Sequence, residues 1–376
     1  MLLALCGLVS CAFLFRSGAL GAGGEISGGT VTKAVLLVVN QGDKNLSVVD
    51  PVTDREIATI SQNLTTVHGH EVAASPDGRF AYVPVYGSGV VGGPGIDGRE
   101  MLVIDIAARK VSGKIDFGSG VRPHCVIYDP VSGLLYVTTE LANSVTIVDP
   151  RTLKVVGSIP TTQPESHMLA ISHDGRRGYT ANVSPGSVSV LDIAARKTLA
   201  VIPISPITQR ISISNDDSMV FTSDQTKPQL AVIDTSSNKV KAWVPLPASG
   251  YGTASTRDGR WLLVAMGGFI LSGSNAPKPG DPPPQGGVAV VDLQTLKVAR
   301  AIPVPGAAQQ ILVSPDGKVA YVSCMGTELD AQAATSGRSA HKPVGRVAVI
   351  DLAEWKVQTV IDVGVGADGL AWASGS

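Results

Sequence analysis

The sequence lacks the residues that mark several common kinds of site. Its four cysteines form neither a Cys-x-x-Cys pair nor a Cys-x-x-Cys-His haem-attachment motif. Charged residues make up 16% of the chain and leave a formal net charge of −1, so the charge gives no reason to expect a nucleic-acid partner. A glycine-rich run at 87–98 opens no helical pattern. These absences argue against attached haem, nucleic acids and dinucleotide cofactors.

A repeat runs through most of the chain. An aliphatic pair followed by aspartate recurs seven times, at Asp50, Asp105, Asp149, Asp192, Asp234, Asp292 and Asp351. Successive aspartates are 55, 44, 43, 42, 58 and 59 residues apart. The shorter intervals match the length of one four-stranded propeller blade, and the longer ones indicate insertions. The aspartates recur in every unit, so we interpret them as turn-formers that accept backbone N–H groups.

Each unit predicts four short strands, here named A to D in chain order. Strand A is an apolar run such as 168–172, and a tight turn such as His173-Asp174-Gly175 joins it to strand B. Strand C ends in the aspartate, and strand D follows. The first unit starts at strand B (34–39), whereas residues 369–373 have the pattern of strand A. We therefore expect an all-β, seven-bladed β-propeller over 34–376, with four antiparallel strands per blade and one blade built from both termini.

The first 22 residues are expected to be a leader, followed by a linker at 23–33. Residues 1–15 are almost wholly apolar and have the length of a signal-peptide core. The run Leu8-Val9-Ser10-Cys11 resembles a lipobox, which would anchor Cys11 to lipid, while Ala19-Leu20-Gly21 resembles an ordinary cleavage site. Either route predicts an exported protein, in the periplasm or at the cell surface. Cys125 and Cys324 fall in distant blades, so we expect them to be unpaired and buried.

Three insertions are predicted on one face of the disc. They lie between strands B and C, at 87–99, 267–287 and 325–346. Direction reverses at each antiparallel strand, so all B-to-C and D-to-A connections share a face. This arrangement favours a lid over a binding site, with tolerated surface insertion as the alternative.

The residues that open strand A form the candidate site at the channel mouth. Counted back from the hairpin, they are His70, His124, His167, Arg210, Tyr251, Gln309 and Asp368. Three histidines in consecutive blades suggest a zinc or copper site made by His70, His124 and His167, with Glu71 or Glu165 behind the rings. In a second interpretation, His124 or His167 is a general base oriented by Glu140, and Arg122 and Arg210 clamp a carboxylate or phosphate. Such a set could open or close a lactone ring. The third interpretation is a polar, water-filled channel without chemistry.

The repeat resembles a known family. Ser75-Pro76-Asp77-Gly78 with Ala81-Tyr82-Val83, and Ser314-Pro315-Asp316-Gly317 with Ala320-Tyr321-Val322, are similar to the YVTN-repeat β-propellers of exported bacterial and archaeal proteins. The wider group includes surface-layer proteins, cytochrome d1-like domains and lactonases. The resemblance implies the propeller fold. For the lactonase relatives it also implies a metal-free channel site of His, Glu and Arg, which His124, Glu140, His167 and Arg210 resemble in kind.

Three functions stay open at this point. The first is an exported propeller that binds a small ligand or metal ion at the channel mouth, with Arg122, Glu165, Tyr251, Gln309 and Asp368 around it. The second is a lactonase or cycloisomerase-type enzyme. The third is a scaffold for protein partners at the cell envelope.

Overall fold

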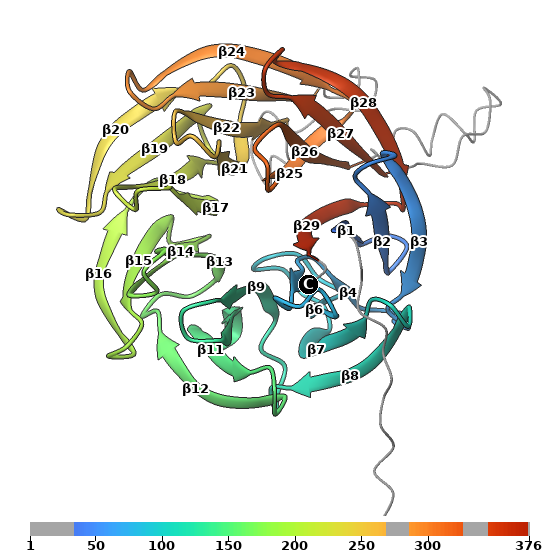
Figure 1. Cartoon of the computed structure of the whole chain (residues 1–376). Helices are drawn as coiled ribbons and strands as arrows, with labels where there is room; N and C mark the ends of the chain where they lie inside the picture. Colours follow the sequence, from blue (N-terminus) through green and yellow to red (C-terminus); the bar gives the residue numbers. More distant parts are fainter. Residues whose placement is uncertain (1–33, 268–285, 326–344, 375–376) are drawn as a thin grey trace, which may run out of the picture.

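The computed structural model describes residues 34–267, 286–325 and 345–374, and these form a closed ring of antiparallel sheets (Figure 1). Blade 1 is β29 (Ala367–Ala373), β1 (Val35–Asn40), β2 (Asn45–Asp50) and β3 (Arg55–Ser61). Blade 2 is β4 (His68–Gly69), β5 (Ala73–Ala74), β6 (Phe80–Gly87), β7 (Asp97–Asp105) and β8 (Lys110–Asp116). Blade 3 is β9 (Pro123–Asp129), β10 (Leu134–Thr139), η1 (Glu140–Ala142), β11 (Ser144–Asp149) and β12 (Lys154–Pro160).

The other four blades are regular. Blade 4 is β13 (Ser166–Ile171), β14 (Arg177–Asn182), β15 (Ser187–Asp192) and β16 (Lys197–Pro203). Blade 5 is β17 (Thr208–Ile213), β18 (Met219–Asp224), β19 (Gln229–Asp234) and β20 (Lys239–Pro245). Blade 6 is β21 (Gly250–Ser255), β22 (Trp261–Met266), β23 (Gly286–Asp292) and β24 (Lys297–Val304). Blade 7 is β25 (Ala307–Val313), β26 (Val319–Met325), β27 (Gly345–Asp351) and β28 (Lys356–Val363).

The predicted fold is confirmed, with one local difference. The innermost strand of blade 2 is interrupted, so that β4 and β5 pair separately with β6. The interruption contains His70 and Glu71, whose side chains enter the polar centre of the ring. The leader, and the greater part of the two later insertions, lie outside the described residues. The described part of the chain contains no helix long and apolar enough to cross a bilayer.

The two ends of the chain close the ring in one sheet, as predicted. Strand β29 pairs antiparallel with β1, with Val35 opposite Ala373 and Leu37 opposite Ala371. In Figure 1 the red β29 lies beside the blue β1 and β2. This pairing leaves β1 with partners on both sides and completes blade 1 as a four-stranded sheet.

Buried aliphatic side chains hold neighbouring blades together. One cluster runs through blades 3, 4 and 5 and includes Ile147, Val190 and Ile233. On the rim, the strand-C aspartates accept backbone N–H groups in every blade, as predicted; Asp50 accepts from Val52 (2.8 Å) and Asp192 from Ala195 (2.8 Å). Cys125 and Cys324 are buried free thiols, also as predicted.

The topology places the start of strand A beside the end of strand B in each blade. Pro123 pairs with Thr139, Ser166 with Asn182, and Thr208 with Asp224. The inner strands surround the centre of the ring (Figure 1). Residues at these two positions therefore gather at one mouth of the channel.

Removing the closing strand tests this architecture. A chain that ends after Gly364 lacks β29 and leaves β1 without its inner partner, so we expect loss of the cooperative unfolding transition and aggregation. Thermal unfolding by circular dichroism and gel filtration measure this. A chain that ends after Ser374 keeps β29 and should unfold like the parent; equal behaviour of the two truncations would contradict the closure.

Candidate functional site

The seven residues that open strand A lie around the channel, one from each blade. His124, His167, Arg210, Tyr251, Gln309 and Asp368 are buried, and only the side chain of His70 is appreciably exposed, at 18%. Six of them fall into two groups. The imidazoles of His70, His124 and His167 stack on one another, while Arg210 joins Tyr251 and Asp368. The amide of Gln309 instead turns back to the carbonyls of Ala307 and Ala308, at 3.4 Å.

The three predicted histidines come together but do not converge as metal ligands. The ring centroids of His124 and His167 are 3.6 Å apart at an interplanar angle of 33°, and those of His70 and His124 are 4.9 Å apart. Stacked rings direct their in-plane lone pairs side by side rather than at a common atom. The described residues contain no group of three or more His, Cys, Asp or Glu side chains that could hold a metal ion. The prediction of zinc or copper therefore finds no support here.

Glu140 orients His167. Glu140 opens η1 directly after β10, and its carboxylate contacts Nδ1 of His167. The hydroxyl of Tyr86 donates to the other oxygen of the same carboxylate (2.8 Å). A carboxylate is only an acceptor, so Nδ1 of His167 carries a proton and Nε2 keeps a lone pair. The amide nitrogen of Gln209 lies 3.4 Å from Nε2.

Arg210 is held by two carboxylates from across the channel. One guanidinium nitrogen donates to Glu71, and another donates to Asp368 at 2.7 Å. The guanidinium carbon also lies 4.8 Å from the ring centroid of Tyr251. The backbone of Gly369 lies close to that of His70. The Gly369 N–H donates to the His70 carbonyl (2.9 Å), and a Cβ at residue 369 would lie 2.5 Å from that oxygen.

Burial and the neighbouring charges shift the pKa values of these groups. Burial lowers the pKa of His124 well below its ordinary value, and the neighbouring His167 and His70 lower it further. Burial also lowers the pKa of His167, although Glu140 opposes this effect. Both imidazoles are therefore neutral at pH 7. Burial raises the pKa of Glu71 to about 7 against the effect of Arg210, whereas Arg210 and His70 outweigh burial and lower the pKa of Asp368.

The loop 88–96 is held in place by a second arginine, Arg122. Arg122 donates to Asp97 (2.6 Å) and to the carbonyls of Val90 (3.2 Å) and Gly93 (2.8 Å). Its guanidinium carbon lies 5.7 Å from the ring centroid of Tyr86. The loop starts in blade 2 and reaches blade 4, where a Cβ on Gly92 would lie 3.0 Å from a carboxylate oxygen of Glu165.

Several predicted partnerships differ in the structure. Arg122 and Arg210, which we expected to clamp an anionic ligand, are both already paired with carboxylates of the protein. Of the carboxylates expected behind the imidazoles, Glu71 binds Arg210, and Glu165 accepts from the hydroxyl and the N–H of Ser184 (N–H, 2.9 Å). The reason is that the ring brings opposite charges from distant blades together, which one blade's sequence does not reveal.

Two contributors, Gln41 and Tyr86, were not found from the sequence. Both stand at the end of strand B, at the same place in the repeat as Glu140: Gln41 follows β1 directly, and Tyr86 is the second-last residue of β6. The amide nitrogen of Gln41 contacts Asp368 and lies 3.0 Å from Nδ1 of His70, and Tyr86 contacts Glu140. Comparing this position across blades, as was done for strand A, would have found them.

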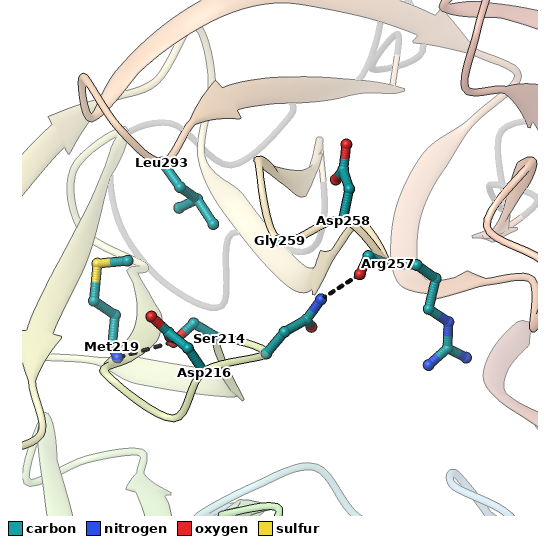
Figure 2. Close-up of a pocket in the computed structure, with 8 residues that line it drawn as sticks. Ser214, Asp216, Met219, Arg257, Asp258, Gly259 and Leu293 are labelled. Carbon is teal, nitrogen blue, oxygen red and sulfur yellow. Dashed lines mark hydrogen bonds between the residues drawn. The ribbon is translucent and has the colours of Figure 1, made fainter.

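A separate pocket lies on the opposite face of the disc, between the A-to-B hairpins of blades 5 and 6 (Figure 2). Its volume is about 290 Å³, and Met219, Arg257 and Leu293 are among its lining residues. The side chain of Asn215 crosses from one hairpin to the next and donates to the carbonyls of Thr256 (2.8 Å) and Arg257 (3.1 Å). No residue of the candidate site lines this pocket.

Replacing Arg210 tests the charge cluster. Arg210→Met leaves Glu71 and Asp368 buried without their cation, so we expect a loss of about 3–5 kcal/mol in the free energy of unfolding. The matched control is Arg151→Met, because Arg151 pairs with Asp149 at the surface and should contribute about 1 kcal/mol or less. Urea unfolding of both variants measures the difference, and equal losses would contradict the cluster's role.

The comparisons with known proteins agree with this geometry. In the solved structures, hydrazine synthase from Kuenenia stuttgartiensis matches with a TM-score of 0.62 and 17% sequence identity, over 83% of this chain and 91% of that chain. At this identity the likeness shows the fold alone. A search of curated proteins found no match. The family model described as "Lactonase, 7-bladed beta-propeller" matches residues 32–242. Because these residues are more than half of the sequence, the chain belongs to the family of seven-bladed β-propeller lactonases.

Proposed function

We propose that the protein hydrolyses small lactones at the channel mouth, with His167 as the general base. The observation that carries this proposal is the contact of Glu140 with Nδ1 of His167, which leaves a lone pair on Nε2; the amide nitrogen of Gln209 lies 3.4 Å from Nε2 and must give way to water when the base acts. Membership of the lactonase family supports the reaction class. The low pKa of His167 also supports it, because a neutral imidazole can accept a proton.

The chemistry needs one proton acceptor and no cofactor. Nε2 of His167 takes a proton from water while the water oxygen attacks the carbonyl carbon of the lactone. The ring C–O bond then breaks, and the proton returns from Nε2 to the leaving alkoxide. The product is a hydroxy acid, and Glu140 stabilises the transient imidazolium.

Access to the site requires a movement of its cover. His124 and His167 are 1% and 2% exposed, so a substrate cannot reach them in this arrangement. The loop 88–96 spans the three blades that supply the histidines, and Arg122 holds it through Val90 and Gly93. We propose that this loop opens to admit the substrate, as loops over active sites commonly do.

A direct assay tests the function. The purified protein is expected to open γ-butyrolactone, δ-valerolactone or dihydrocoumarin in the presence of EDTA, measured by proton release. His167→Asn removes the base and should lower kcat roughly 10²–10⁴-fold. The control is His173→Asn, because His173 is exposed in an A-to-B hairpin and pairs only with Asp217. A parent inactive on all three lactones, or equal rates for the two variants, would refute the proposal.

The pH profile tests the state of the base. Activity requires neutral His167, and burial lowers the pKa of this group below its ordinary value of about 6.5. We therefore expect kcat/KM to stay constant as the pH falls from 8 to 6.5 and to decline only at lower pH. An acid limb centred at or above pH 6.5 would assign the proton transfer to a different group.

A further inference from the structure

We propose that His70 presents an N–H group at Nε2 and donates it to the lactone carbonyl oxygen, and that Gln41 fixes this tautomer. The inference rests on the proposed function and deepens it, because it adds the group that stabilises the oxyanion. The carrying observation is the side chain of Gln41, whose amide nitrogen lies between Asp368 and the ring of His70.

The carboxylate of Asp368 decides which way Gln41 faces. Arg210 donates to one oxygen of Asp368 (2.7 Å) and opposes the effect of burial on its pKa, which lies below its ordinary value, so the group is an anion. The side-chain atom of Gln41 that contacts the other oxygen must be a donor, and it is therefore the amide nitrogen.

The same nitrogen decides the tautomer of His70. It carries a second hydrogen and lies 3.0 Å from Nδ1 of His70. The competing contact, between Nδ1 and Asp368, is 3.4 Å, which is long for a charge-assisted hydrogen bond. Nδ1 therefore accepts from Gln41, and the proton of the neutral imidazole resides on Nε2. Within the described residues, Nε2 of His70 is buried and has no hydrogen-bond partner.

His70 and His167 thus have opposite tautomers. Glu140 accepts from Nδ1 of His167, so Nε2 there has a lone pair, while Gln41 donates to Nδ1 of His70, so Nε2 there has a hydrogen. Addition of water to a carbonyl needs both functions, a base for the water and a donor for the developing oxyanion. A neutral imidazole can be that donor.

The residues that set the two tautomers occupy the same position in the repeat. Gln41 follows strand B of blade 1 and acts on the histidine of blade 2, and Glu140 follows strand B of blade 3 and acts on the histidine of blade 4. Exchanging one amide group for a carboxylate at this position reverses which ring nitrogen is protonated.

The first test measures the tautomer of His70 directly and does not depend on enzyme activity. In the full-length protein labelled with ¹⁵N-histidine, NMR at neutral pH should show His70 protonated at Nε2, and Gln41→Glu should move the proton to Nδ1. Gln225→Glu is the matched control, since Gln225 has the same repeat position in blade 5 and donates to Gly250 (2.7 Å), away from the histidines. A parent with the proton of His70 on Nδ1 overturns the proposal.

The second test measures the rate of hydrolysis of a lactone that the parent protein opens. His70→Leu removes the donor and should lower kcat roughly 10²–10³-fold with little change in KM. His70→Gln places an amide N–H near the position of Nε2 and should recover at least about tenfold of that loss. If His70→Leu is as fast as the parent, the role of His70 is wrong while the lactonase function stands. A parent that opens no lactone overturns both.

Discussion

The paired carboxylates on Arg210 are the constraint on which the rest of the site depends. Arg210 comes from blade 5, whereas Glu71 and Asp368 come from blades 2 and 1 on the other side of the channel. A buried guanidinium needs a carboxylate partner, because desolvation would otherwise be too costly. The pairing keeps Asp368 ionised, and an ionised Asp368 orients Gln41, which in turn orients His70. In the proposed arrangement, a salt bridge across the channel thus determines which nitrogen of His70 carries the hydrogen.

The fold could be predicted almost completely from the sequence, because the same strand and turn pattern occurs seven times along the chain. The aspartate spacing gave the number of blades, and the phase of the two termini gave the closure that β29 and β1 make. The exception was the interrupted inner strand of blade 2, where His70 and Glu71 leave the sheet. An interruption that occurs in one blade cannot be predicted from the sequence features that all seven blades share.

The candidate site was predicted in part. The opening position of strand A was found in each blade, and the histidines do come together. Gln41 and Tyr86 were missed because only the opening position of strand A was compared across the blades, and the position of Glu140 at the end of strand B was not. The partners of Arg122 and Arg210 depend on distances across the ring and could not follow from the order of residues.

The packed imidazoles can supply a base and a donor for the proposed reaction, whereas the described residues contain no group of side chains that could hold a metal ion. The rings come from neighbouring blades and pack against one another, with 3.6 Å between the centroids of His124 and His167 and an interplanar angle of 33°. Two of the rings are contacted separately by a residue at the strand-B end of the preceding blade, His70 by Gln41 and His167 by Glu140. Tyr86, at the same repeat position in blade 2, donates to Glu140 instead. The residue type at this one position of the repeat differs between blades, and it determines which groups the histidines contact.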